Sequence, residues 1–362
     1  MKFSMRNIPI RLFIFALIMA IVTVGCKDSI DSDSDSSNPQ PVASENTTLR
    51  VVSGSENRNL EPLIQQYAQQ NGLTIQMKYI GSVDIKLLLE QGSAIEYDAV
   101  WPANSLWITL GDTQNVVKHE ASIMRSPVVL AIKKPIAEQL GWVGRTDIRV
   151  EDIVTAAEAN DLKLMMTSAT QSNSGASAYF GFLTALAGTT GALTTEQLND
   201  PAVGEKVKQI LSLIERSSSS SGFLKDLFLS RYADFDGMFN YEAVVIEANQ
   251  ALVQQGLDPL YAIYPVVGLA VADSPLAYVD KGNADKEQLF LGLQQYLLSE
   301  ATQQEILKLG RRVGVVGITP ENADTSVFNP DWGIDVTRVF TSIRFPSAAV
   351  IEEALDLYQS KF

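Results

Sequence analysis

Residues 49–67 read Leu49-Arg-Val-Val-Ser-Gly-Ser-Glu-Asn-Arg-Asn-Leu-Glu-Pro-Leu-Ile-Gln-Gln-Tyr67, and they begin the region that decides the fold. The first five residues are typical of a short strand, and apolar residues then recur at helical spacing until Gly72. Over 74–80 the apolar residues alternate, which indicates a second strand. A helix over 83–91 and a strand over 97–101 should follow. This alternation of strands and helices predicts an α/β fold with a parallel sheet between helices.

Each of these strands leads into a turn of small and hydroxylated residues. The turns are Ser53-Gly54-Ser55-Glu56, Gly81-Ser82-Val83-Asp84 and Pro102-Ala103-Asn104-Ser105. In open α/β sheets the carboxyl ends of the strands border the ligand crevice, and helix N-termini there offer unpaired N–H groups. Ser, Gly and Asn are also what helix caps and tight turns require. Both interpretations stay open for each turn, and we expect at least one turn to contact a ligand.

A second lobe is expected to begin with the apolar strand Ser126-Pro-Val-Val-Leu-Ala-Ile-Lys. A strand over 162–167 then leads into Ser168-Ala-Thr-Gln-Ser-Asn-Ser-Gly-Ala-Ser, and an apolar helix continues to Gly188. This helix start has more hydroxyls and amides than one cap needs. A glycine there lets a ligand approach the backbone, and the helix dipole favours an anion by about 0.3–1 kcal/mol for each favourable placement. The alternative is a polar loop with a capped helix.

The N-terminus has the features of a signal peptide. Three basic residues, Lys2, Arg6 and Arg11, precede an uncharged apolar run from Leu12 to Val24. This run has the length of a signal-peptide core and is shorter than the ~20 residues that span a membrane. Thr23-Val-Gly-Cys26 resembles the lipobox of bacterial lipoproteins, although threonine stands where leucine is usual. We therefore predict a lipoprotein signal peptide over 1–25 and acylation of Cys26, the only cysteine. Ordinary secretion is the alternative.

Residues 26–48 are rich in Ser and Asp and poor in apolar side chains, which predicts a disordered tether. The formal net charge of the chain is −14, and removal of three positive charges with residues 1–25 makes it −17. So acidic a chain is a poor partner for nucleic acid, because phosphate binding needs clustered Lys and Arg. With one histidine, His119, and one cysteine, no zinc site of the Cys/His type can be built. No nucleophile elbow or phosphate-binding loop occurs, so we expect neither an enzyme nor a cofactor; a carboxylate pair for glycoside chemistry stays open.

Short motifs occur along the chain in a recognisable order. They are Val51-Val-Ser-Gly-Ser-Glu, Leu60-Glu-Pro-Leu, Tyr79-Ile-Gly-Ser, Tyr97-Asp-Ala-Val-Trp, Ser126-Pro-Val-Val-Leu-Ala-Ile, Ser172-Asn-Ser-Gly, Tyr241-Glu-Ala, Tyr264-Pro and Gly310-Arg-Arg-Val-Gly. In this order they resemble bacterial extracellular solute-binding proteins of the type 2 periplasmic-binding fold. The likeness is nearest to the solute-binding half of proteins that also carry a von Willebrand factor A domain, and molybdate, sulfate and phosphate binders are more distant.

The resemblance implies two hinge-linked lobes, each a sheet flanked by helices, with lobe 1 over 49–124 plus 268–362 and lobe 2 over 125–267. The C-terminal stretch from Gly314, with a closing helix after Pro346, would strap lobe 1 or bind a partner. The implied ligand contacts are Ser53, Gly54, Ser55, Gly81, Ser82, Asn104, Ser172, Ser174, Gly175 and Tyr241. A packed core tyrosine is the alternative for the last of these.

The expected function is capture of a small oxyanion-like ligand at the cell envelope, outside the cytoplasm, and its delivery to an ABC-type permease. An interaction or sensor module on the same fold is one alternative. Another is a binder of an amino acid or organic acid, for which Arg125, Arg311 and Arg312 are candidates because guanidinium pairs with carboxylate; structural salt bridges are their other interpretation. Trp101 and Trp107 can stack a ring or pack in the core.

Overall fold

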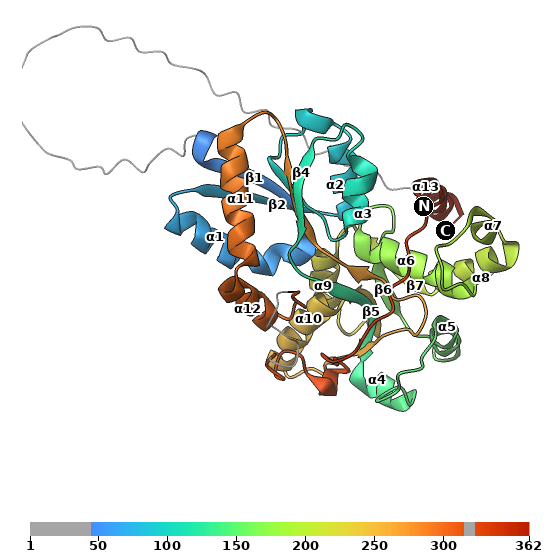
Figure 1. The fold of residues 1–362 in the computed structure, drawn as a ribbon. Coiled ribbons are helices and arrows are strands. Elements are labelled where there is room, and N and C mark those ends of the chain that lie inside the picture. The colour runs from blue at the N-terminus through green and yellow to red at the C-terminus, as the bar shows by residue number, and fades with distance from the viewer. Residues whose placement is uncertain (1–44, 315–322, 362) are drawn as a thin grey trace, which may run out of the picture. The chain divides into compact units, whose positions relative to one another are not determined.

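Two β-sheets with helices on their faces make up the computed structural model, which describes residues 45–314 and 323–361 of the 362-residue chain (Figure 1). The predicted signal peptide, Cys26 and nearly all of the predicted tether lie outside the described residues. None of the helices within 45–314 and 323–361 combines the length and apolar character needed to cross a bilayer.

The first sheet has five strands. They are β1 (Thr48–Gly54), β2 (Thr74–Ile80), β3 (Ala99–Trp101), β4 (Val117–Ser122) and β11 (Pro275–Val279). Their order is β2-β1-β3-β11-β4, with β1 parallel to β2 and β3, and β11 antiparallel to β3 and β4. The surrounding helices are η1 (Glu45–Thr47), η2 (Ser55–Leu60), α1 (Glu61–Gln70), α2 (Ser82–Leu89), η3 (Gly92–Ala94), α3 (Ser105–Gly111), α11 (Ala284–Leu298) and α12 (Glu300–Lys308).

Helices on both faces explain why β1 is apolar without alternation. Val51 packs with Ile64 and Phe290 on one face, whereas Val52 packs with Ile85 and Ile108 on the other. A strand that is buried on both sides is typical of parallel α/β sheets. The predicted α/β fold is therefore confirmed for this sheet.

The second sheet has six strands. They are β5 (Ser126–Lys133), β6 (Leu164–Thr167), β7 (Ile214–Ser218), β8 (Gly237–Tyr241), β9 (Leu260–Ile263) and β10 (Val271–Ala272). Their order is β10-β5-β8-β6-β7, with β9 also paired to β5. The helices are α4 (Lys134–Gln139), α5 (Val150–Ala159), α6 (Asn173–Leu186), α7 (Thr195–Leu198), α8 (Pro201–Ser212), α9 (Ser221–Ser230), α10 (Glu242–Gln254), η5 (Pro330–Trp332) and α13 (Ala348–Lys361). We call the two sheets with their helices the first and second lobes.

The chain passes between the lobes near Arg125, between β10 and β11, and after α12. The backbones of Arg125 and Arg312 pair there, with N–O distances of 2.7 and 3.2 Å. Arg312 also donates to both carboxyl oxygens of Glu242 at 2.8 and 2.9 Å, and the Tyr264 hydroxyl donates to the same carboxylate at 2.5 Å. The salt-bridge interpretation of Arg312 is the one that the structure shows, because its guanidinium ties the crossing segments together.

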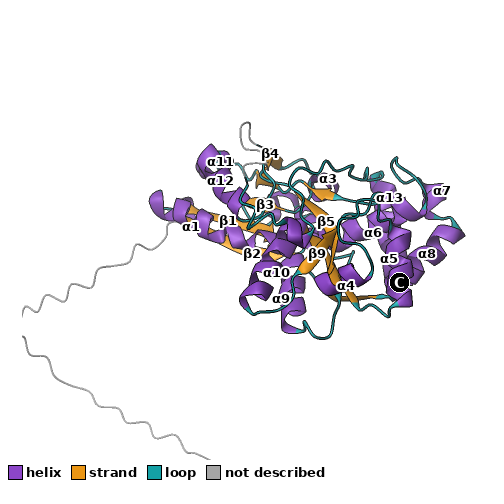
Figure 2. Cartoon of the chain, turned by 90° about the horizontal axis from the view of Figure 1, so that it is seen from below, coloured by secondary structure: helices purple, strands orange, loops and turns teal. Residues whose placement is uncertain are grey.

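The C-terminal segment 323–361 packs on the second lobe and not on the first, where it was expected, whereas β11, α11 and α12 do lie in the first lobe. Phe328 and Trp332 join a core on one face of the second sheet. Farther on, α13 buries Ile351 and Ala354 against the helices of the other face, and Tyr179 of α6 donates to the Ala354 carbonyl at 3.0 Å. Figures 1 and 2 both place α13 beside α7 and α8. The remaining lobe boundaries stay a prediction.

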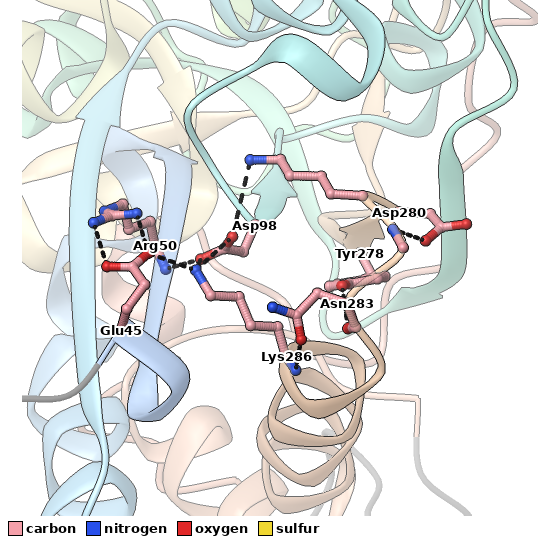
Figure 3. Close-up of polar contacts among 9 residues, drawn as sticks. Glu45, Arg50, Asp98, Tyr278, Asp280, Asn283 and Lys286 are labelled. Atoms are coloured by element: carbon pink, nitrogen blue, oxygen red, sulfur yellow. Dashed lines mark hydrogen bonds and ion pairs between the residues drawn. The ribbon is translucent and has the colours of Figure 1, made fainter.

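A buried ion pair fixes the start of the described chain to the first lobe (Figure 3). Lys286 of α11 lies 3.1 and 3.0 Å from the two carboxyl oxygens of Asp98 and 3.1 Å from a carboxyl oxygen of Glu45. Asp98 also accepts from the backbone N–H of Arg50 at 2.9 Å. The N-terminus of β1 is thereby held between η1 and α11.

Candidate functional site

The N-termini of two helices of the second lobe, α6 and α9, lie in contact with each other. Neither has a side-chain cap. Ser174 Oγ lies 2.8 Å from Ser221 Oγ and 2.9 Å from Thr167 Oγ1, and Ser172 Oγ lies 3.4 and 3.3 Å from the two serine hydroxyls. We call Thr167, Ser172, Ser174 and Ser221 the hydroxyl cluster; all four are buried. Hydroxyls both donate and accept, and two helix N-termini favour negative charge, so the cluster can hold an anion.

Gly175 has a packing role beside this cluster. A Cβ on Gly175 would lie 2.2 Å from the Thr167 carbonyl oxygen. Glycine therefore lets α6 pack directly on the end of β6, which places the serines of the two helices within hydrogen-bonding distance. This explains Gly175 without a ligand.

Residues of the first lobe contact the same helix starts. Ser55 Oγ accepts from the Gly222 N–H at 2.8 Å, and the Val83 N–H donates to the Gln171 carbonyl at 3.2 Å. A Cβ on Gly81 would lie 2.0 Å from that Gln171 oxygen and 2.7 Å from the Ser219 oxygen. The lobes are thus closed on each other, and glycine is required where their backbones meet.

A small cavity of about 20 Å³ lies between the lobes, beside these contacts. It is enough for on the order of one water molecule. Its polar lining comes from both lobes and consists of Glu56, Arg125, Ser126, Tyr241, Ser274 and Arg311. A solute larger than water would therefore need the lobes to lie farther apart than they do in this structure, both to enter and to stay bound.

Glu56 is the acidic group of this cavity. Its carboxyl group folds back over Gly54, where a Cβ would lie 2.0 Å from Glu56 Oε1. Oε1 is buried and has no hydrogen-bond partner among the described residues; the same is true of Oδ1 of the adjacent Asn57 and of Ser220 Oγ, which precedes α9. Burial raises the pKa of Glu56 to about 7, against the opposing effects of a hydrogen bond from its own backbone and of the Arg311 charge. The closed interface therefore contains an acceptor that no described residue satisfies.

Tyr241 joins the cavity to the other lobe through a chain of hydrogen bonds. Trp107 Nε1 donates to Asn173 Oδ1 at 2.7 Å, and Asn173 Nδ2 donates to the Tyr241 hydroxyl at 2.9 Å. Burial, together with the charge of Glu56, raises the pKa of Tyr241 well above its ordinary value. The tyrosine is therefore a neutral hydroxyl at neutral pH. The ring nitrogen of Trp107 thus makes a hydrogen bond from the first lobe to the second.

Ser53 and Ser82 have partners within the first lobe, whereas Asn104 also donates to the Val271 carbonyl of β10 in the second lobe at 3.4 Å. Ser53 Oγ donates to the Gly54 and Trp101 carbonyls at 3.2 and 3.4 Å, and Ser82 Oγ accepts from the Ala103 N–H at 3.0 Å. Asn104 caps α3 by accepting from the Leu106 N–H at 2.9 Å. These bonds fit the turn and cap interpretation. Contact of any of the ten residues with a ligand stays a prediction.

The three arginines have different surroundings. Arg311 is buried, pairs with Glu247 and donates to the Glu56 carbonyl at 2.8 Å. Arg312 is bound by Glu242, as described above. Arg125 is exposed and lines the cavity, and its side chain makes no hydrogen bond or ion pair with the described residues. Arg125 is thus the arginine that is free to meet an anion.

Sequence reasoning did not single out Glu56 or Ser221 as site residues. Glu56 stands inside the first quoted turn, but nothing in the sequence shows that its carboxyl group is buried. Ser221 ends a run of serines before an apolar helix, the same signal that marked Ser172 and Ser174. This run of serines is therefore the sequence feature that can predict Ser221 as a site residue. Within 45–314 and 323–361 no group of three potential metal ligands occurs.

Comparison with known proteins assigns the chain to a protein family. A family model described as "Bacterial extracellular solute-binding protein" matches residues 49–312. The chain belongs to this family. It is a family of solute binding rather than catalysis, located outside the cytoplasm, whose members bind small ligands and serve ABC-type permeases. A search of curated protein sequences found no match.

Solved structures share the fold of this solute-binding protein at low identity. The sulfate-binding protein SubI of Mycobacterium tuberculosis has a TM-score of 0.53 and 14% identity, covering 74% of this chain and 87% of its own. A Thermotoga lettingae ABC-transporter solute-binding protein bound with α-D-tagatose has a TM-score of 0.60 and 12% identity, covering 86% and 93%. A substrate-binding protein of an Agrobacterium tumefaciens ABC transporter has a TM-score of 0.61 and 11% identity, covering 86% and 94%. These likenesses confirm the two-lobe periplasmic-binding fold.

The raised pKa of Glu56 has a consequence for stability. Its pKa is about 7 in the closed structure and 4.5 ordinarily, so its stabilising contribution is complete below pH 4.5 and is lost as pH rises through 7. We expect the free energy of unfolding of the wild type to fall between pH 5.5 and pH 8.5 by more than that of Glu56→Gln. Urea unfolding at both pH values measures this difference. An equal fall in the two proteins would contradict the burial of the Glu56 carboxyl group.

Proposed function

We propose that this solute-binding protein encloses a small oxyanion-like ligand between its lobes and delivers it to an ABC-type permease, while acylated Cys26 anchors it to the membrane. The observation that carries the proposal is the hydroxyl cluster at the joint start of α6 and α9. Neutral N–H and O–H donors at two helix N-termini suit an anion that loses its hydration shell on binding. No charged side chain has to be dehydrated at the same time.

The geometry of the closed interface supports capture by closure. Ser55 and Gly81 of the first lobe reach the residues that precede and begin α6 and α9, so a ligand at these helix starts would touch both lobes. A ligand that contacts both lobes favours the closed state by its extra affinity for that state. Closure of this kind is the conformational signal that a permease can recognise.

A second candidate ligand is an amino acid or organic acid. The observation that favours it is the free guanidinium of Arg125 at the cavity, since arginine binds carboxylates through two parallel hydrogen bonds. This candidate differs from the first in its anionic group and in its use of the cavity that Arg125 lines.

Calorimetric titration of the mature protein tests the proposal with molybdate, tungstate, sulfate and phosphate, and with acetate, glycolate and glycine for the second candidate. We expect saturable heat from at least one anion. The double variant Ser174→Ala/Ser221→Ala should bind that anion at least about tenfold more weakly, because a hydrogen bond to a charged group contributes roughly 1.5–3 kcal/mol. Exposed Ser93→Ala is the matched control and should bind as the wild type does. Flat traces for the four inorganic anions would remove the oxyanion version.

A further inference from the structure

Glu56 lines a cavity between the lobes, and one of its carboxyl oxygens lacks a hydrogen-bond donor. Its Oε1 is buried and accepts no hydrogen bond from the donors around it, and Arg311 Nε in the same cavity is likewise buried without a partner. The guanidinium of Arg311 binds Glu247, the Leu309 carbonyl and the Glu56 carbonyl, and the Tyr241 hydroxyl is held by Asn173. An acceptor that is left unpaired in a dry interface costs roughly 1–3 kcal/mol, more when it is charged. A bound molecule that donates a hydrogen to Oε1 would remove this cost.

The same cavity offers positive potential to an anionic group. The free guanidinium of Arg125 lines it, and the Asn173–Tyr241 hydrogen bond connects it to the start of α6. A molecule that spans the cavity would therefore meet an acceptor at Glu56 and cationic or N–H donors elsewhere. An anion without a hydrogen to donate would meet the carboxylate of Glu56 as a like charge.

We propose that Glu56 is a specificity-determining ligand contact, which selects small anions that also carry a hydrogen-bond donor. This inference rests on the proposed function and narrows its ligand class to hydroxylated or ammonium-bearing carboxylates and protonated oxyanions. These sources share one chemistry: a negative group for the helix starts and Arg125, and an N–H or O–H for Glu56 Oε1.

The charged and titratable groups that face Glu56 come from each packed element. Arg311 follows α12, Glu247 belongs to α10, Tyr241 ends β8, and Arg125 precedes β5. Lys225 of α9 pairs with Glu247 at 2.9 Å, so the carboxylate of Glu247 is shared between two cations. Glu56 Oε1 is not paired with a cation in this way. When the Glu56 carboxyl group is protonated, it no longer repels an anion that has no hydrogen to donate. Donor-lacking anions should therefore bind better at pH 5.5 than at pH 8.

The test uses probe pairs that differ in a donor: glycolate against acetate, glycine against acetate, and phosphate against sulfate. Calorimetry at pH 8 compares the wild type with Glu56→Gln, which keeps the shape of the side chain and adds an N–H donor. Glu352→Gln is the matched control, since Glu352 is exposed and its side chain has no partner among the described residues. Glu56→Ala is the second variant in case Glu56→Gln does not fold.

In at least one pair the wild type and the control should prefer the donor-bearing member by about tenfold or more. Glu56→Gln should reduce this preference to about twofold or reverse it, because the amide can donate to the donor-lacking anion. Glu56→Ala should reduce the preference without reversing it. Binding of both members alike by the wild type, or an unchanged preference in the Glu56 variants, would overturn the inference alone. Silence from every probe would overturn the inference and the proposed anion-binding function together.

Discussion

Replacing Gly81 with alanine should leave this solute-binding protein folded and prevent its lobes from closing. The φ of Gly81 is −75°, which any residue adopts, so alanine causes no backbone strain. Its methyl group would instead lie 2.0 Å from the Gln171 carbonyl oxygen and 2.7 Å from that of Ser219. Both atoms are backbone of the second lobe, and the clash is relieved only when the lobes separate.

Loss of closure should lower ligand affinity by about a hundredfold, because the ligand then loses at least two charge-assisted hydrogen bonds from one lobe. Calorimetry with the tightest probe measures the affinity, and small-angle X-ray scattering measures the separation of the lobes. The free energy of unfolding should stay within about 0.5 kcal/mol of the wild type.

Gly204→Ala in α8 is the control, since nothing lies within 4 Å of its Cβ position, and it should bind normally. Wild-type affinity in Gly81→Ala would show that ligand binding does not need this interface.

Replacing Lys286 with methionine should cause the largest loss of stability, about 3–5 kcal/mol, because it removes the only side chain that bonds both oxygens of the buried Asp98 carboxylate among the described residues. Asp98 is 3% exposed, and its nearest cation after Lys286 is Lys281, at 3.9 Å. Urea unfolding measures the loss, with exposed Lys206→Met as the control that should change stability by less than about 0.5 kcal/mol. Adding Asp98→Leu to Lys286→Met should restore part of the stability. A loss below about 1 kcal/mol would mean that solvent reaches Asp98.

Local pattern was enough to predict the first lobe up to β3. The strand β1, the helix α1 and the strand β2 follow one another closely, so hydrophobic periodicity identified each of them. The antiparallel return of β11 beside β3 pairs Ala277 with Val100 and Tyr278 with Ala99, and no local signal encodes a pairing between segments so far apart. The C-terminal helix α13 was expected, but an apolar stripe does not say which lobe it will cover.

The candidate site was predictable only in its residue types. Runs of small and hydroxylated residues correctly drew attention to helix starts, and Ser172 and Ser174 do meet there. The same runs could not separate Ser53 and Ser82, which bond within the first lobe, from residues at the closed interface. Glu56 differs from the many other acidic residues by its burial and its missing partner, which depend on how two distant lobes pack.

A crystal structure of the mature protein with its tightest probe tests most directly where the ligand lies. The account predicts density between the lobes, within about 3.2 Å of the Ser174 or Ser221 hydroxyl and close to Glu56. Density on an outer face, or a closed interface that stays empty while calorimetry shows saturable binding, would contradict it.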